Sequence, residues 1–386
     1  MLRKCLSLAV FVLCMTGLGA GAPAAPARAV VAYVFARDNV LQPGQIDAQR
    51  LTRINYAFAN IENGRIVTGF AHDAENFAFL ESLKNENPSL TVLVSVGGWL
   101  WSTNFSDMAL TSESRAVFIQ SVMDFLARYK LDGLDIDWEY PGMPGAGHPF
   151  RPEDKENFTL LLKELRVRFT AETSKTHKPL YLTFAAGAND DFLAHTDMGK
   201  AQQYLDTVNL MCYDYYEQGS DLITGNHAPL FTDPADPKQI SAAKSVAAFV
   251  KAGVPAGKII LGVPFYGRAW GQVPDVNHGL FQPGKAAPNV NARYEAIAQT
   301  MLNQAPDQGY VRYWDEKASV PFLYNSKQQI FVSYEDPESL VAKCRFVLSQ
   351  KLGGVMFWEY SNDPSGTLLR AIDNSLHPQP SKARQP

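Results

Sequence analysis

The chain has 386 residues, enough for one large domain or a few smaller ones. Hydrophobic residues make up 46% and charged residues 19%, which is ordinary for a globular protein with a buried core. A net charge of −4 leaves no excess of positive charge for binding nucleic acid, so we expect no nucleic-acid partner.

The first segment is typical of a secretory signal peptide. Arg3 and Lys4 precede an apolar run at residues 6–18, which is too short to span a membrane comfortably. Residues 27–29 read Ala-Arg-Ala, a pattern of small residues that fits a cleavage site. We expect residues 1–29 to be removed and the mature protein to be secreted and extracellular, without membrane contact. A membrane anchor is the alternative.

The cysteines fall into two pairs. Cys5 and Cys14 leave with the signal segment, and Cys212 and Cys344 remain. A secreted protein with two cysteines can form one disulfide or none. Because Cys212 lies in an apolar strand-like segment and Cys344 in a helical one, buried free thiols are the favoured interpretation.

Eight apolar segments are predicted to be strands, and helical segments precede several of them. The strands are 30–35, 54–61, 91–98, 133–139, 181–188, 207–215, 258–268 and 353–360. The helices are 113–130, 156–173, 238–253 and 337–353. This alternation predicts a parallel sheet, and eight units predict a closed (β/α)8 barrel of the α/β class.

Residues 271–336 interrupt the alternation. They contain short β-like runs between turn residues, and a connection this long without structure of its own would be unusual. We expect a small inserted α+β subdomain between strand seven and its helix. The barrel then comprises 30–270 and 337–376, and residues 377–386 form a disordered tail.

A row of acids in LDGLDIDWEYPG, residues 131–142, points to a catalytic site. Asp135, Asp137 and Glu139 alternate with apolar residues, so a strand directs all three to one face. Catalytic groups of such barrels lie at the carboxyl ends of strands. Carboxylates this close raise one another's pKa, which can keep Glu139 protonated as a general acid while an Asp stays ionised.

Two other interpretations of these acids fit the sequence less well. A solvated acidic strand conflicts with the apolar residues that alternate with the acids. A calcium loop would need a glycine where Tyr140 stands and a glutamate where Ala146 stands, so that interpretation fails.

Five motifs together resemble glycoside hydrolase family 18, the chitinases, in the bacterial type with an insertion subdomain. They are DGLDIDWE at 132–139, SVGG at 95–98, MCYDYY at 211–216, GVPFYGR at 262–268 and GGVMFWEYSND at 353–363. The motifs span the mature chain and follow the order of the family. One alone would be suggestive, whereas five in order are highly specific.

The resemblance implies a retaining mechanism in which the acetamide oxygen of the substrate is the nucleophile. Glu139 would protonate the glycosidic oxygen and later activate water. Asp137 would hold the acetamide N–H and stabilise the oxazolinium ion, and Asp135 would pair with Asp137. Tyr213 would hydrogen-bond the acetamide oxygen, and Asp214 would contact the distorted sugar.

The resemblance also implies a set of binding and supporting residues. The expected substrate contacts are Trp358, Trp99, Asp214, Arg268, Met211, Tyr140, Tyr33, Phe58 and Trp270. The expected supporting residues are Ser95, Gly97, Gly98 and Asp132. Trp358 would be the floor under the cleaved sugar and Trp99 a platform on the product side, because aromatic rings pack on apolar sugar faces. Arg268 could instead be an ordinary ion-pair partner, and Tyr33 and Phe58 could be plain core.

The sequence therefore predicts a secreted, monomeric chitinase that acts on chitin and chito-oligosaccharides, with no metal and no organic cofactor. The alternatives are a chitin-binding lectin of the same fold, an endo-β-N-acetylglucosaminidase acting on glycoprotein glycans, and a peptidoglycan-directed relative. The retained acids favour catalysis over a lectin, and the inserted subdomain and tryptophans favour chitin.

Overall fold

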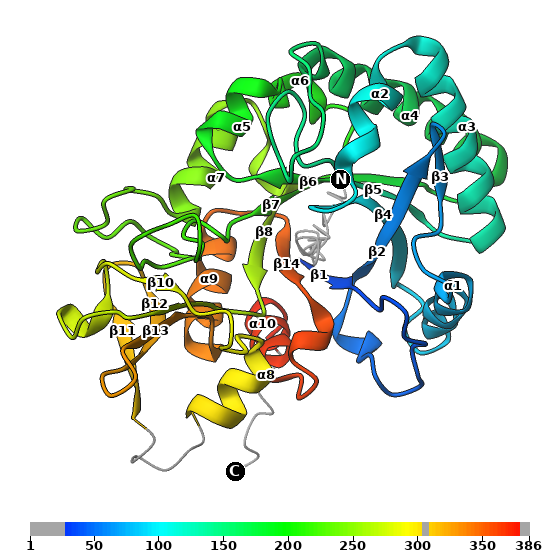
Figure 1. Cartoon of the computed structure of the whole chain (residues 1–386). Helices are drawn as coiled ribbons and strands as arrows, with labels where there is room; N and C mark the ends of the chain where they lie inside the picture. The colour runs from blue at the N-terminus through cyan, green and yellow to red at the C-terminus, as the bar shows by residue number, and fades with distance from the viewer. Residues whose placement is uncertain (1–27, 303–308, 379–386) are drawn as a thin grey trace, which may run out of the picture.

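The computed structural model describes residues 28–302 and 309–378, so most of the predicted signal peptide and most of the predicted tail lie outside the described residues. Eight parallel strands close into a barrel surrounded by helices (Figure 1). The strands are β1 (Ala29–Val34), β2 (Arg53–Glu62), β4 (Thr91–Gly97), β5 (Gly133–Asp137), β6 (Tyr181–Gly187), β7 (Thr207–Met211), β8 (Ile259–Pro264) and β14 (Gly354–Trp358). Pairing of β1 with both β14 and β2 closes the ring, which confirms the predicted (β/α)8 fold.

The long helices lie on the outside of the ring. They are α1 (Asp73–Ser82), α3 (Ser112–Tyr129), α4 (Asp154–Thr176), α7 (Ala242–Lys251), α9 (Pro337–Ser349) and α10 (Thr367–Leu376). The shorter ones are α2 (Phe105–Ala109), α5 (Asp190–His195) and α6 (Met198–Ala201). Local signals set their ends: Thr111 and Ser114 form a capping box before α3, and Asp336 caps α9 ahead of Pro337.

Strand β5 has the alternation that the sequence predicts. Trp138, just beyond its end, points away from the barrel interior and stacks on Phe105 with ring centroids 5.2 Å apart. It also meets Phe158 of α4. Asp135 and Asp137 are buried on the opposite, inner face of the strand. The outward apolar residues therefore hold the strand against the helices while the acids face inward.

The inserted subdomain is an antiparallel sheet beside the barrel, drawn in yellow and orange in Figure 1. Its strands, in the order β10-β9-β13-β12-β11, are β9 (Arg268–Gly271), β10 (Lys285–Ala286), β11 (Tyr310–Asp315), β12 (Val320–Asn325) and β13 (Ile330–Ser333), with the short helix α8 (Tyr294–Ile297). The sheet begins at Arg268, earlier than the predicted residue 271, because Arg268 already pairs with Ser333 of β13.

Two further expectations can be compared with the fold. Cys212 and Cys344 are both free and buried, as favoured above. Within residues 28–302 and 309–378, no helix is both long and apolar enough to cross a membrane.

Candidate active site

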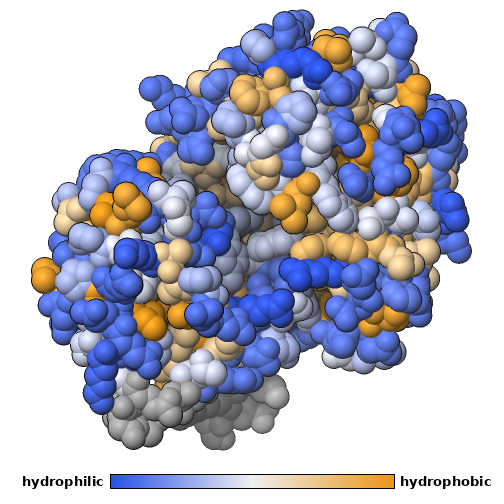
Figure 2. Space-filling model, in the orientation of Figure 1, coloured by the Kyte–Doolittle hydropathy of each residue, from blue (hydrophilic) through white to orange (hydrophobic). Residues whose placement is uncertain are grey.

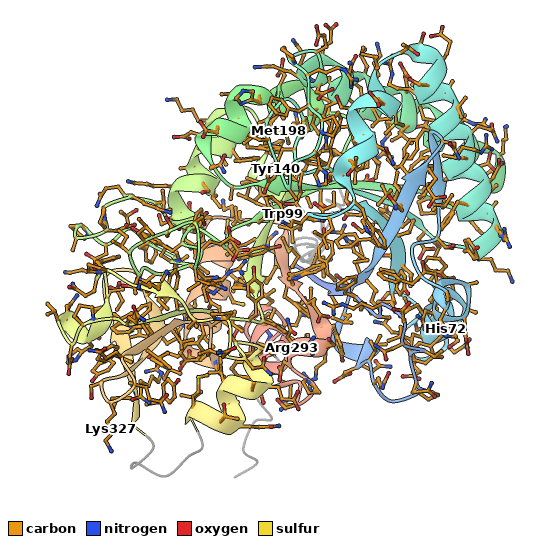
Figure 3. The ribbon with its side chains drawn as sticks, viewed as in Figure 1. His72, Trp99, Tyr140, Met198, Arg293 and Lys327 are labelled. Carbon is orange, nitrogen blue, oxygen red and sulfur yellow. The ribbon has the colours of Figure 1, made fainter. Side chains whose placement is uncertain are left out.

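A cleft of about 1520 Å³ opens at the carboxyl ends of the barrel strands. Figure 2 shows the molecule hollowed between the barrel and the inserted subdomain. Asp137, Glu139 and Trp358 line this cleft. In Figure 3, Trp99 and Tyr140 lie on one side of the molecule's centre, and Arg293 lies on the other.

Asp135 lies beneath the cleft and is held by donors from four strands. It accepts hydrogen bonds from the Tyr33 hydroxyl (2.9 Å), the Ser95 hydroxyl (2.8 Å), the Asn209 amide (3.0 Å) and the Thr183 hydroxyl. Burial raises the pKa of Asp135, and these donors oppose the rise. Its oxygens are thus fully engaged, and the expected hydrogen-bonded pair with Asp137 is not formed among the described residues.

Asp137 and Glu139 form the reactive end of the row. The Oδ1 atom of Asp137 is buried and has no hydrogen-bond partner among the described residues. Burial beside Glu139 holds the pKa of Asp137 well above its usual range. Burial also raises the pKa of Glu139 to about 7; the Tyr140 hydroxyl opposes this shift and the negative charge of Asp214 adds to it. Glu139 can therefore carry a proton near neutral pH.

Close backbone approach between β4 and β5 fixes the end of the acid row. Gly97 has φ +106° and would place a Cβ only 2.3 Å from the Asp137 carbonyl oxygen, so no larger residue fits. The Gly98 N–H donates to the same oxygen (2.8 Å), and its absent Cβ leaves room for the ring of Phe58. Ser102 also fixes the backbone at Glu139, because its hydroxyl accepts a hydrogen bond from the Glu139 N–H (2.9 Å).

Asp214 is the centre of a second, ion-paired cluster. It accepts from the Tyr266 hydroxyl (2.7 Å) and the Arg268 Nε (2.7 Å), and His227 Nδ1 lies 3.5 Å from its Oδ1. Burial alone would raise its pKa, but His227 and Arg268 outweigh burial and hold the pKa well below the usual range. Arg268 also pairs with Glu217 at 2.9 Å, so Arg268 is both an ion-pair partner and a cleft residue.

Aromatic rings form the floor of the cleft. Trp358 stacks with Phe58 at a centroid distance of 5.4 Å and an interplanar angle of 21°. Trp99 stands at the rim with half of its surface exposed (50%), edge-on to Tyr140. These rings offer the flat apolar surface on which sugars pack.

Tyr213 and Met211 also line the cleft, as the sequence predicts. Burial raises the pKa of Tyr213 well above its usual value, and the negative charges of Asp137 and Asp214 add to the rise. Its hydroxyl therefore stays protonated and can donate a hydrogen bond into the cleft.

Three predicted site residues lie elsewhere. Trp270 is fully buried in the core of the subdomain and donates to the Asp221 carbonyl, because β9 turns its ring away from the cleft. Tyr33 is only 2% exposed and lies under the floor, where it binds Asp135 rather than a ligand. Asp132 lies at the opposite, amino end of β5 and pairs with Lys84 (2.6 Å). The prediction that Trp270 and Tyr33 contact the substrate is therefore wrong, because neither lines the cleft. Asp132, predicted as a supporting residue, binds the Val92 N–H at the far end of the strand instead of supporting the acids.

Five residues that hold the acids of the site through hydrogen bonds or ion pairs were not predicted. They are Ser102, Thr183, Asn209, His227 and Tyr266. Thr183 and Asn209 are single polar residues inside apolar strands, and this placement is a usable signal because a buried polar group needs a partner. His227 lies in a loop, where no periodicity marks it.

A (β/α)8 barrel with buried acids at its carboxyl mouth and an aromatic floor defines the class of barrel glycoside hydrolases. The chain belongs to one family of that class, glycosyl hydrolases family 18, whose family model matches residues 29–363. The resemblance stated from the motifs is thereby confirmed.

Individual relatives agree with this assignment. The chain is 37% identical to "Chitinase A1" of Niallia circulans over 86% of its own length and 55% of that protein, so it spans about half of that relative. It is 32% identical to "Chitotriosidase-1" of Mus musculus over 89% of this chain and 76% of the other. A solved family 18 N-acetylglucosaminidase from Paenibacillus barengoltzii is 40% identical, with a TM-score of 0.82 over 90% of this chain and 99% of that one.

Proposed function

We propose that this chain hydrolyses the β-1,4 linkages of chitin and chito-oligosaccharides by a retaining, substrate-assisted mechanism. One observation carries the proposal: Glu139, with its pKa raised to about 7, lies beside an oxygen of Asp137 that has no partner within residues 28–302 and 309–378, and both acids line a cleft floored by Trp358. A proton donor and a free acceptor are the two groups that an acetamido sugar needs for this reaction.

In the first step the acetamide oxygen of the sugar attacks its own anomeric carbon. Glu139 gives its proton to the glycosidic oxygen, whose bond to that carbon breaks. Asp137 Oδ1 accepts the acetamide N–H, and this hydrogen bond stabilises the positive oxazolinium ion that forms. The Tyr213 hydroxyl donates to the acetamide oxygen and orients it for attack.

In the second step Glu139, now ionised, takes a proton from water. The water oxygen attacks the anomeric carbon from the side the leaving group has vacated, and the acetamide oxygen departs. Two inversions give net retention of the β configuration. Asp135 keeps the row in place through its four donors.

The choice of substrate is supported by the aromatic floor and by the relatives, which are named as chitinases and an N-acetylglucosaminidase. A lectin of this fold would not need Glu139, so its presence favours hydrolysis. Action on glycoprotein glycans or peptidoglycan is left to the substrate test below. The mature protein is proposed to be secreted and monomeric, and the reaction as written uses no metal and no organic cofactor.

The decisive experiment is turnover of the N-acetylglucosamine hexamer by Glu139→Gln. General acid catalysis is worth ~100- to 10,000-fold, so kcat should fall by that factor while the hexamer still binds. Glu113→Gln, a fully exposed change on α3, is the matched control and should keep wild-type turnover. The wild type should release the β-anomer in excess at early times.

Near-wild-type turnover by Glu139→Gln would show the assignment to be wrong. Binding of the hexamer by the wild type without cleavage would indicate a lectin. Neither binding nor cleavage would point to glycoprotein glycans or peptidoglycan as the substrate.

A further inference from the structure

Two arginines and one buried acid line the cleft beyond Trp358, and they come from three separate segments. Arg37 follows β1, Arg293 precedes α8 in the inserted subdomain, and Glu359 follows β14. All three line the cleft. In Figure 2, strongly hydrophilic side chains gather from both lobes at the lower end of the hollow. The segments are far apart in sequence, so the fold itself assembles this cationic end.

The ring contacts place Arg37 over the aromatic ring next to Trp358. The ring of Phe35 lies 5.6 Å from that of Trp358, and the guanidinium of Arg37 lies 4.8 Å above the Phe35 ring. Arg37 therefore lies one ring away from the proposed cleavage position. Arg293 lies across the centre from Trp99 and Tyr140, as Figure 3 shows.

The N–H donors of both guanidinium groups are available to a ligand. Within the described residues no hydrogen bond or ion pair engages the side chain of Arg37 or Arg293, and both residues are exposed. Glu359 is buried and is bound by the N–H and hydroxyl of Ser361 (2.9 and 2.5 Å). Burial raises the pKa of Glu359, and the charges of Arg293 and Arg37 act against that rise.

We propose that Arg37 and Arg293 grip the sugar at the non-reducing end of the bound chain, so that the enzyme cuts at a fixed short distance from that end. The proposal rests on the chitinase function above. Glu139 must face the leaving group, and Trp99 lies on that side, so the end beyond Trp358 holds the other part of the substrate. A terminal sugar has one free hydroxyl more than an internal one, and a guanidinium presents five donors to such acceptors.

The test uses the hexamer reduced at one end, so that mass spectrometry of early products locates the cut. The wild type should release one unlabelled short product size first. Arg37→Ala and Arg293→Ala should each release several sizes and raise KM about tenfold, the factor expected for one hydrogen bond to a charged group. Alanine keeps the Cβ at Arg37, whose φ is +53°, so the backbone cost is unchanged.

Arg128→Ala is the matched control, because Arg128 is also exposed and rests on an aromatic ring, that of Tyr129 at 5.2 Å, but lies outside the cleft. It should match the wild type. Products of all sizes from the wild type, or unchanged products and KM in both cleft variants, would overturn the proposal.

Binding separates this proposal from the function on which it rests. In a Glu139→Gln background, adding Arg37→Ala should weaken calorimetric binding of the hexamer about tenfold. If the double variant binds the hexamer as tightly as Glu139→Gln alone, Arg37 does not bind the terminal sugar, even where hydrolysis by the wild type is confirmed. A wild type that binds the hexamer but never cleaves it would reject the chitinase and leave the weakened binding as evidence for the grip alone.

Discussion

At the scale of single residues, the site works by giving neighbouring acids opposite electrostatic surroundings. Glu139 and Asp137 are buried with few donors, and their pKa values rise. Asp214 is only half-buried, and Arg268 and His227 hold its pKa low. The cleft therefore offers a protonated acid and a permanent negative charge at the same pH, which is the division of labour that acid catalysis needs.

This arrangement predicts the alkaline limb of the pH profile. The donor form of Glu139 is the protonated one, and its pKa is about 7, so kcat/KM should fall as the pH rises through about 7. Burial is the main cause of the raised pKa, and the negative charge of Glu217 adds to it. Glu217→Gln removes that charge and should move the limb to lower pH.

The measurement is kcat/KM for the hexamer between acid and alkaline pH. Glu113→Gln is again the control, since this carboxylate lies outside the cleft. If kcat/KM of Glu217→Gln falls at the same pH as in the wild type, or at a higher pH, the electrostatic explanation is contradicted.

The sequence predicted the positions of the acidic residues better than it predicted the residues that hydrogen-bond to them. The period of two in β5 placed Asp135, Asp137 and Glu139 on one face without any structure. It could not show that Asp135 binds Tyr33 and Asn209 instead of Asp137, because those contacts join strands distant in sequence. For the same reason Trp270 was misplaced, since only the pairing of β9 with β13 turns its ring into the subdomain core.

At the scale of elements, the barrel strands could be predicted from local sequence, whereas the start of the subdomain depends on pairing between distant strands. All eight barrel strands were predicted within a few residues, because buried parallel strands are continuous apolar runs. Helices α1 and α10 and the short strand β3 (Arg65–Val67) were not predicted. The start of the subdomain was placed too late because the chain passes from β8 to β9 without a clear break in hydrophobicity.

Helix α9 links the barrel to the cleft through a buried ion pair. Lys343 pairs with Glu335, and both side chains are almost fully buried. The Lys343 ammonium also donates to the Ala228 carbonyl (2.6 Å), next to His227 of the Asp214 cluster. The pair thus holds the loop that carries His227 against the helix.

Lys343→Met should lower the free energy of unfolding by ~3–5 kcal/mol, because it leaves the charge of Glu335 buried without a partner. The double variant Lys343→Met/Glu335→Leu should recover most of that loss. Urea unfolding measures both, with Lys163→Met on the exposed face of α4 as the control. A double variant no more stable than the single one would refute this explanation.

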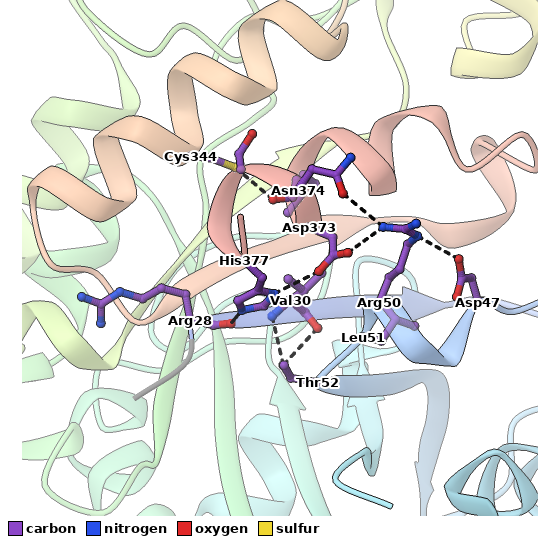
Figure 4. A network of polar contacts seen from close by, with 12 residues as sticks. Arg28, Val30, Asp47, Arg50, Leu51, Thr52, Cys344, Asp373, Asn374 and His377 are labelled. Atoms are coloured by element: carbon purple, nitrogen blue, oxygen red, sulfur yellow. Dashed lines mark hydrogen bonds and ion pairs between the residues drawn. The ribbon is translucent and has the colours of Figure 1, made fainter. Parts of the chain in front are cut away.

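At the scale of the whole molecule, the two ends of the described chain are joined at the amino ends of the barrel strands, in the contacts drawn in Figure 4. Asp373 of α10 accepts from Arg50 (2.7 Å) and lies 2.9 Å from His377 Nδ1. The other ring nitrogen of His377 lies 2.8 Å from the Arg28 carbonyl oxygen, directly before β1. These contacts tie the last helix to the first strand, where the ring closes.

Asp373→Ala should lower the free energy of unfolding by about 1 kcal/mol, because partly exposed ion pairs contribute little each. It should leave kcat and KM for the hexamer unchanged, since the contacts lie at the amino ends of the strands. Asp124→Ala, an exposed change on α3, is the control for unfolding. A large loss of activity without loss of stability would show that the two ends of the barrel are coupled.

The same junction determines how this catalyst can be held in place. Strand β1 begins and helix α10 ends on the side of the barrel away from the cleft. A bead, surface or module joined directly before β1 or directly after α10 is therefore on the far side from an incoming polymer. Such a linker leaves the mouth of the cleft open.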